Sequence, residues 1–280
     1  MRVRCCALGA VAGATLGAVL SGPARAQVTR ATAAREFGDM AADVGYLWAS
    51  PFRAHRRDWL DATAVTAGFL ALLPLDGAID RWLLRHPRSA VLVAVSPVRE
   101  SNEELSKLWT VARLVPISGA LVIAGMLSDS RELREAGYGC LSGWALSNTL
   151  RHSIYLGVSR HRPYVAHGDQ YRFGVPGGPW DEHSFFAGHP TNAFACATFW
   201  SERFKLGIGE PALYLAATAT ALSRIADRRH WASDTFLGVA VGYAVGRAVA
   251  HRYERRELVR RARGRAGTPR VVIPLWERRF

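Results

Sequence analysis

Six apolar runs rich in small residues recur along the chain, and they constrain its fold more than any other feature. Their residues show no strand-like alternation, so helices are the favoured structure. Small side chains also let neighbouring helices pack closely. The sequence therefore predicts an all-α fold, a helical bundle of about six core helices. The runs are Ala62–Leu75, Leu114–Leu127, Ala136–Val158, Pro190–Trp200, Pro211–Ile225 and Thr235–Ala250.

The N-terminus has the layout of a secretory signal peptide. Arg2 and Arg4 precede the apolar stretch Cys5–Leu20, and Ala24–Ala26 forms a suitable cleavage site. Cleavage there would leave a chain exported from a bacterial cytoplasm. An uncleaved membrane anchor is the alternative.

The basic charge of the chain is concentrated at its C-terminus. Residues 251–280 contain ten Arg and three Glu, so +7 of the net charge of +13 lies in this tail. Such a tail suits anionic lipid headgroups. Nucleic acid is not expected as a partner, because no nucleic-acid-binding motif accompanies the tail. We expect a signal peptide (1–26), an N-terminal helical region (27–107), a helical core (108–250) and a basic tail (251–280).

The apolar runs leave two cellular locations open. They are mostly about 14–16 residues long, below the roughly 20 residues that cross a bilayer, so a soluble periplasmic bundle is one expectation. The other is an inner-membrane protein with five spans, in which Ala62–Leu75 does not cross. Its short loops 128–135 and 201–210 and the basic tail would then face the cytoplasm, as the positive-inside tendency requires. We favour the five-span arrangement, with the polar motifs facing the periplasm.

A polar motif precedes the last apolar run. It consists of Ser223 and Arg224, five residues, His230, three residues and Asp234. If Asp234 lies early in a helix, His230 and Asp234 share a face. The carboxylate can then accept a hydrogen bond from one imidazole nitrogen and leave the other free to attack. The planar guanidinium of Arg224 suits phosphate oxygens. A solvated helix start with ordinary ion pairs is the alternative interpretation.

Two further motifs lie upstream, at Tyr155–Pro163 and Ser184–His189. In this order, the three motifs resemble the type 2 phosphatidic acid phosphatase family. That family shares its fold with vanadium-dependent haloperoxidases and bacterial class A acid phosphatases. Its pattern is Lys-x6-Arg-Pro, Pro-Ser-Gly-His and Ser-Arg-x5-His-x3-Asp, of which the third motif matches in full and the first two in part. The resemblance covers roughly Leu108–Ala250.

The resemblance implies a phosphatase that uses neither a metal nor another cofactor. His230 would be the nucleophile that forms a phosphohistidine, Asp234 would orient it, and His189 would protonate the leaving oxygen. The amides of Gly188 and His189, at a helix start, suit an anion. The phosphate-binding residues would be Arg162, Arg224, Gly188 and Ser223, together with Tyr155 and Arg151.

The sequence departs from the family pattern at two positions. Tyr155 stands where the family has Lys, and Ala187 removes the hydroxyl of the second motif. Losing one preorganised donor typically costs about 10²–10³ in rate. Arg151 lies one helical turn before Tyr155 on the same face, so its longer side chain is expected to reach the phosphate instead. Arg160 is expected either at the mouth of the site or in solvent.

Two other functions compete with a phosphatase acting on phosphorylated lipids or small phosphate esters. One is a vanadate-dependent haloperoxidase that uses the same residues. The other is a membrane protein that binds lipid headgroups through its Arg-rich tail without turnover. Membrane lipids are expected partners in the favoured function.

The cysteines give little information about function. Cys140 and Cys196 both lie in apolar stretches, where a buried free thiol is the default expectation. A disulfide between them stays open in an oxidising compartment. No Cys/His spacing predicts a zinc site.

Overall fold

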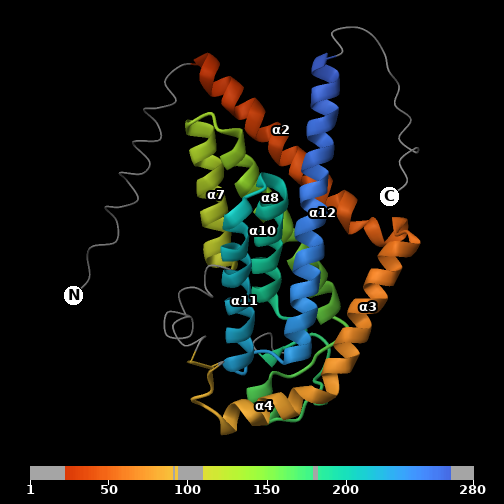
Figure 1. The fold of residues 1–280 in the computed structure, drawn as a ribbon. Helices are drawn as coiled ribbons and strands as arrows, with labels where there is room; N and C mark the ends of the chain where they lie inside the picture. The colour runs from red at the N-terminus through yellow and green to blue at the C-terminus, as the bar shows by residue number, and fades with distance from the viewer. Residues whose placement is uncertain (1–22, 91, 94–109, 179–181, 266–280) are drawn as a thin grey trace, which may run out of the picture.

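The computed structural model describes residues 23–90, 92, 93, 110–178 and 182–265. These residues form helices joined by short connections, with two isolated β-bridges, so the expected all-α fold is confirmed. Figure 1 shows most of the helices running roughly along one axis. Four predicted runs lie within a helix, and Ala62–Leu75 and Ala136–Val158 each extend three residues past the end of one. These helices are α3 (Arg56–Leu72), α7 (Val111–Leu127), α8 (Arg131–Tyr155), α10 (Gly188–Phe204), α11 (Glu210–Ala226) and α12 (Ala232–Arg265).

The close packing of α10 on α12 forms the centre of the bundle. Gly238, Gly242 and Gly246 of α12 are four residues apart and therefore share one face. A Cβ added to any of the three would overlap the main chain at or just before the start of α10 or within it. The glycines thus let the two backbones approach closely. The carbonyl oxygens that they face belong to Ala187, Thr191 and Ala195.

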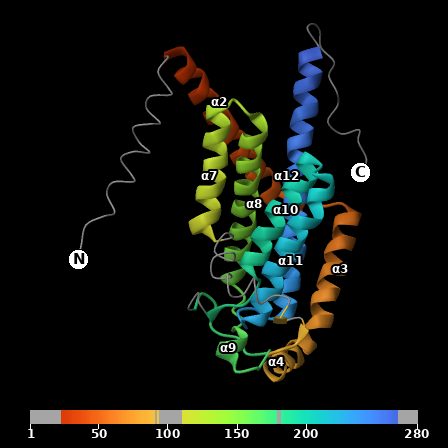
Figure 2. The same ribbon diagram turned by 60° about the vertical axis from the view of Figure 1, so that its left-hand side comes forward.

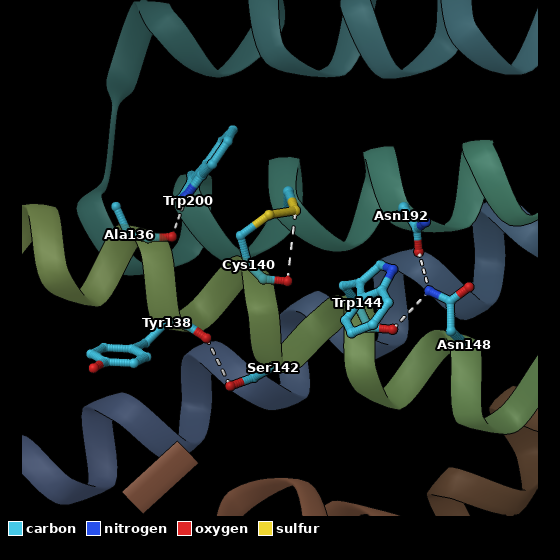
Figure 3. Close-up of a disulfide and its surroundings, with 9 residues drawn as sticks. Ala136, Tyr138, Cys140, Ser142, Trp144, Asn148, Asn192 and Trp200 are labelled. Atoms are coloured by element: carbon cyan, nitrogen blue, oxygen red, sulfur yellow. Dashed lines mark hydrogen bonds between the residues drawn. A yellow bond between two sulfur atoms is a disulfide. The ribbon is translucent and has the colours of Figure 1, made fainter. Parts of the chain in front are cut away.

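A disulfide joins α8 to α10, and it corrects the expectation of free thiols. Cys140 and Cys196 are buried, and their Cα atoms lie 4.8 Å apart. Facing positions on two packed helices fall within the distance that a disulfide spans. Figure 3 shows the bond beside a hydrogen bond from Asn148 Nδ2 to Asn192 Oδ1 (3.0 Å), which ties the same two helices together.

Helix α2 (Pro23–Trp48) crosses the bundle and packs against α8 and α12 (Figure 1). Its buried Asp43 accepts a hydrogen bond from Arg252 Nε (2.8 Å) and forms an ion pair with Arg256 Nη2 (2.7 Å), both of α12. Because α12 runs without a break from Ala232 to Arg265, the boundary expected at residue 250 falls inside a helix. The expected cleavage site Ala24–Ala26 lies in the first turn of α2, and residues 1–22 of the expected signal peptide lie outside the described residues.

Helix α4 (Asp76–Arg85) lies across the lower end of the bundle and follows α3 through the short 3-10 turn η2 (Leu73–Leu75) (Figures 1 and 2). It falls within the expected N-terminal helical region (27–107), in a part that no apolar run marks. The buried residues of α4 are Asp76, Gly77 and Asp80. This helix therefore buries carboxylates where most surface helices bury apolar side chains.

Within the described part of the chain, one helical stretch, Arg56–Arg85, is long and apolar enough to cross a membrane. Few of its residues are buried, and Trp59 and Leu70 are among its exposed side chains. Among the described residues, Ala112–Leu127 of α7 is also apolar but is shorter than the length required to cross a membrane. The five-span expectation excluded the first of these stretches and counted spans among the later helices, so it is not confirmed.

The three glycines of α12 that face α10, here called the glycine row (Gly238, Gly242 and Gly246), give a prediction about stability. Gly242→Ala would force the backbones of α10 and α12 apart, so we expect it to lower the free energy of unfolding by about 1–3 kcal/mol. Denaturant unfolding measures this change. Gly119→Ala in α7 is the matched control, because an added Cβ there meets no atom within 4 Å. The control is expected to gain about 0.5–1 kcal/mol of stability, and equal effects of the two substitutions would contradict the prediction.

Candidate active site

The three polar motifs meet at the lower end of the bundle. This end contains the last turn of α8, the start of α10 and the connection from α11 to α12 (Figure 2). The connection is only five residues long, from Asp227 to Trp231, and it holds His230 in a buried position. Residues far apart in the sequence are thus brought to one place by the antiparallel packing of the helices.

The imidazole of His230 has a fixed orientation. Its Nδ1 lies 2.6 Å from the carbonyl oxygen of Ser184. A carbonyl only accepts hydrogen bonds, so Nδ1 carries the proton and Nε2 keeps its lone pair. Burial holds the pKa of His230 well below its usual value, and the positive charge of Arg162 lowers this pKa further. The ring is therefore neutral at neutral pH, with Nε2 available as a nucleophile.

Asp234 does not accept the hydrogen bond from His230 that the spacing predicted. His230 precedes the first helical residue, Ala232, so the four-residue periodicity of a helix does not apply between them. The Oδ2 atom of Asp234 instead accepts a bond from Ser184 Oγ at 2.6 Å. The carboxylate therefore acts on His230 through Ser184, whose carbonyl holds the ring.

Arg160 is buried, with 1% of its surface exposed, and does not lie in solvent or at the mouth of the site. Its Nη1 donates to Asp234 Oδ1 at 2.8 Å, and its Nη2 donates to Asp76 Oδ2 at 2.7 Å. Burial raises the pKa of Asp234 to about 6, against the opposing effect of Arg160. Arg160 had been expected at the mouth of the site or in solvent, and Asp76 was missed because no spacing in the sequence links residue 76 to the motifs.

His189 lies in the first turn of α10. The N-cap residue, Ala187, gives no side-chain hydrogen bond, and Pro190 has no amide proton. The amides of Gly188 and His189 therefore form the open N-terminus of this helix, where an anion is stabilised. Burial lowers the pKa of His189 to about 3, and nearby positive charges contribute. These belong to Arg224, Arg151, Arg162 and Arg229.

The guanidinium of Arg151 lies against Gly188. A Cβ on Gly188 would come within 2.9 Å of Cζ and Nη1 of Arg151. The positive charge is thus beside the open start of α10, as the hypothesis about Arg151 requires. Tyr155 has different contacts: its hydroxyl donates to the Gly178 carbonyl, and its ring packs on His183 with centroids 4.3 Å apart.

The remaining phosphate-binding candidates differ in their hydrogen-bond partners. Arg162 is anchored through Nε to the His183 carbonyl at 2.9 Å. The buried Nε of Arg224 has no hydrogen-bond partner among the described residues, so it can donate to an oxyanion. Ser223 is fully buried, and its Oγ donates its proton to the Thr220 carbonyl at 2.8 Å, within the same helix.

Arg229 is a further cation close to these residues, in the connection from α11 to α12. It is exposed, and its Cζ lies 5.4 Å from the centroid of the Tyr164 ring. Its charge nevertheless acts on His189 and Arg224. The arginine cluster, defined as Arg151, Arg162, Arg224 and Arg229, can therefore offset several negative charges at His189 and His230.

No group of three or more His, Cys, Asp or Glu side chains within the described residues is arranged to hold a metal ion.

Comparison with known proteins shows what this site is similar to. Residues 138–258 match the model of the PAP2 superfamily. Lipid A 1-phosphatase of Porphyromonas gingivalis is 44% identical over 68 residues, which cover 23% of this chain and 15% of that relative. No solved structure shows significant similarity to the chain. The matched residues 138–258 contain all three motifs, so the resemblance read from the sequence is supported over this segment.

Proposed function

We propose that this protein is a phosphatase that hydrolyses phosphomonoesters or diphosphates of lipids through a phosphohistidine on His230. The observation that carries the proposal is the orientation of His230. Its Nδ1 is held by the Ser184 carbonyl, and its Nε2 belongs to a neutral ring whose pKa is lowered first by burial and then by Arg162, His189 and Arg224. A neutral imidazole among several guanidinium groups is suited to attack phosphorus.

The first step transfers the phosphoryl group to the protein. Nε2 of His230 bonds to phosphorus as the ester P–O bond breaks, and His189 gives a proton to the leaving oxygen. The negative charge of a bound phosphate raises the proton affinity of His189, whose pKa is about 3 without it. Arg151, Arg162 and Arg224 offset the charge on the transferring group.

The second step returns His230 to its starting state. His189 takes a proton from water as the water oxygen attacks phosphorus and the P–N bond breaks. During the intermediate, the phosphorylated ring is cationic, and the Ser184 carbonyl and the Asp234 carboxylate behind it stabilise that charge. All groups in this scheme come from the chain, so chelators are expected to leave the activity intact.

A phosphorylated lipid is the proposed substrate class, and the similarity to a lipid A 1-phosphatase supports it. The exposed apolar surface of Arg56–Arg85 also favours contact with lipid. The Cys140–Cys196 disulfide is typical of an exported protein. We therefore propose a site that faces the periplasm.

Phosphate release from phosphorylated lipid in detergent tests the function. We expect turnover that resists chelators and is inhibited by vanadate. His230→Ala should lower kcat by more than about 10⁴-fold, as expected for loss of a nucleophile. His189→Ala should slow turnover by about 10²–10⁴-fold. Acid-labile label from ³²P-substrate should attach to wild type but not to His230→Ala.

Two results would contradict this function. One is loss of turnover with chelator, which would require a different mechanism. The other is full labelling of His230→Ala, which would place the covalent intermediate on another residue. Vanadate-dependent bromide oxidation without phosphate release would favour the haloperoxidase.

Arg151 provides a second test of the site. Arg151→Ala should lower kcat/KM for phosphate release by about 10²–10³-fold, because it removes a donor beside the transferring group. Arg151→Lys keeps the charge and should recover part of the loss. Tyr155→Phe is the matched control one turn away on α8, and it should change kcat/KM by much less. Unchanged kinetics in Arg151→Ala would exclude a role for this residue.

Gly188 provides a third test that separates activity from stability. In Gly188→Ala, the new methyl group would displace the guanidinium of Arg151. We expect kcat/KM to fall by about 10-fold or more, while the melting temperature changes little because the displaced group is the end of a flexible side chain. Steady-state kinetics and thermal unfolding of one preparation check both effects. A clear fall in the melting temperature together with the fall in kcat/KM would contradict this explanation.

A further inference from the structure

Helix α4 directs its two carboxylates into the protein. Asp76 and Asp80 are buried. Oδ1 of Asp80 lies 2.7 Å from Nε of Arg228, and Arg228 lies two residues before His230. Burying an unpaired carboxylate costs several kcal/mol. Each carboxylate is accordingly paired with an arginine of the matched segment 138–258, although α4 itself lies outside that segment.

Asp76 begins a continuous chain of buried contacts that ends at the nucleophile. Its Oδ2 accepts from Arg160 Nη2 at 2.7 Å, and Arg160 Nη1 donates to Asp234 Oδ1 at 2.8 Å. Asp234 Oδ2 accepts from Ser184 Oγ at 2.6 Å. The carbonyl of the same serine accepts from His230 Nδ1 at 2.6 Å. Each of these five residues is at most 4% exposed.

Asp76 also holds the start of α12 directly. Its Oδ1 accepts from the backbone amide of Ser233 at 2.9 Å, and its Oδ2 accepts from the hydroxyl of Ser233. Ser233 lies between His230 and the rest of α12. The carboxylate therefore satisfies an amide of the first turn, which has no partner within the helix.

We propose that Asp76 is a positioning residue for His230, which it orients through Arg160, Asp234 and Ser184. This inference rests on the proposed function and extends it beyond the matched segment. Asp76 touches none of the reacting atoms in the scheme. Its carboxylate fixes the guanidinium of Arg160 from one side, so the other side of that group stays on Asp234. Buried hydrogen-bond chains couple strongly because little water screens them.

The test compares Asp76→Asn with Asp43→Asn. Asp43 is a matched control, because it is a fully buried carboxylate that binds two arginines at the opposite end of α12. Both substitutions should lower the melting temperature. Only Asp76→Asn should lower kcat, by about 10²-fold with KM unchanged, which is the loss expected from a misplaced nucleophile. Equal kcat values in the two variants would overturn the proposal.

The pH profile gives a readout that lost stability does not move. Asp234 faces Arg160, Asp76 and, through Ser184, His230. Burial raises the pKa of Asp234, the charge of Arg160 lowers it, and the charge of Asp76 raises it further. Removing the Asp76 charge should therefore shift the acid limb of kcat/KM to lower pH in Asp76→Asn and leave it in place in Asp43→Asn. An unmoved limb in both variants would count against the proposal.

Asp76→Glu covers the case in which Asp76→Asn does not fold. It keeps the charge but moves the carboxylate by one methylene, so its kcat should lie between those of Asp76→Asn and wild type. Wild-type kcat in this variant would show that the carboxylate position is irrelevant, and would overturn the proposal.

Nuclear magnetic resonance of ¹⁵N-histidine protein separates this inference from the proposed function. The Nδ1 proton of His230, assigned with His230→Gln, should be protected from exchange in wild type and at least 10-fold less protected in Asp76→Asn or, if that variant does not fold, in Asp76→Glu. Absence of turnover in wild type would reject the phosphatase and leave this measurement valid. Equal protection in wild type and variant would reject the role of Asp76.

Discussion

The buried guanidinium of Arg160 is the interaction on which the geometry of the site depends. A charge with 1% exposure is tolerated only when carboxylates and hydrogen bonds replace its water. Asp76 and Asp234 meet this requirement from two helices that are far apart in the sequence. Because both carboxylates must reach one planar group, the starts of α4 and α12 are held at a fixed separation. The position of His230 follows, since it lies directly before α12.

The glycine row of α12 sets a second distance, between the helices that carry the two histidines. His189 belongs to the start of α10, and His230 precedes α12. Without side chains at Gly238, Gly242 and Gly246, the two helices pack with their backbones in contact. In the proposed mechanism, a nucleophile and a proton donor must lie on opposite sides of one phosphoryl group. The close packing therefore serves the site as well as the core.

Sequence reasoning predicted helices from composition and motifs, and it failed where the result depended on how helices face one another. The apolar runs located the main helices. The pairing of Cys140 with Cys196 depends on the register of α8 against α10, which periodicity does not give. Asp234 was expected to bind His230 because a helix was assumed to include both. Helix α4 was not located within the expected N-terminal helical region, because its buried face is polar and no apolar periodicity marks it.

The two departures from the family pattern have a common explanation in the proposed scheme. Tyr155 removes a positive charge and Ala187 removes a hydroxyl donor, and these losses lie on different helices. Arg151 carries a guanidinium that lies against Gly188, the residue after Ala187. One planar group with several N–H donors can supply both the charge and the hydrogen bond. Gly188 leaves the space for that group, because a side chain at position 188 would occupy the place of the Arg151 guanidinium.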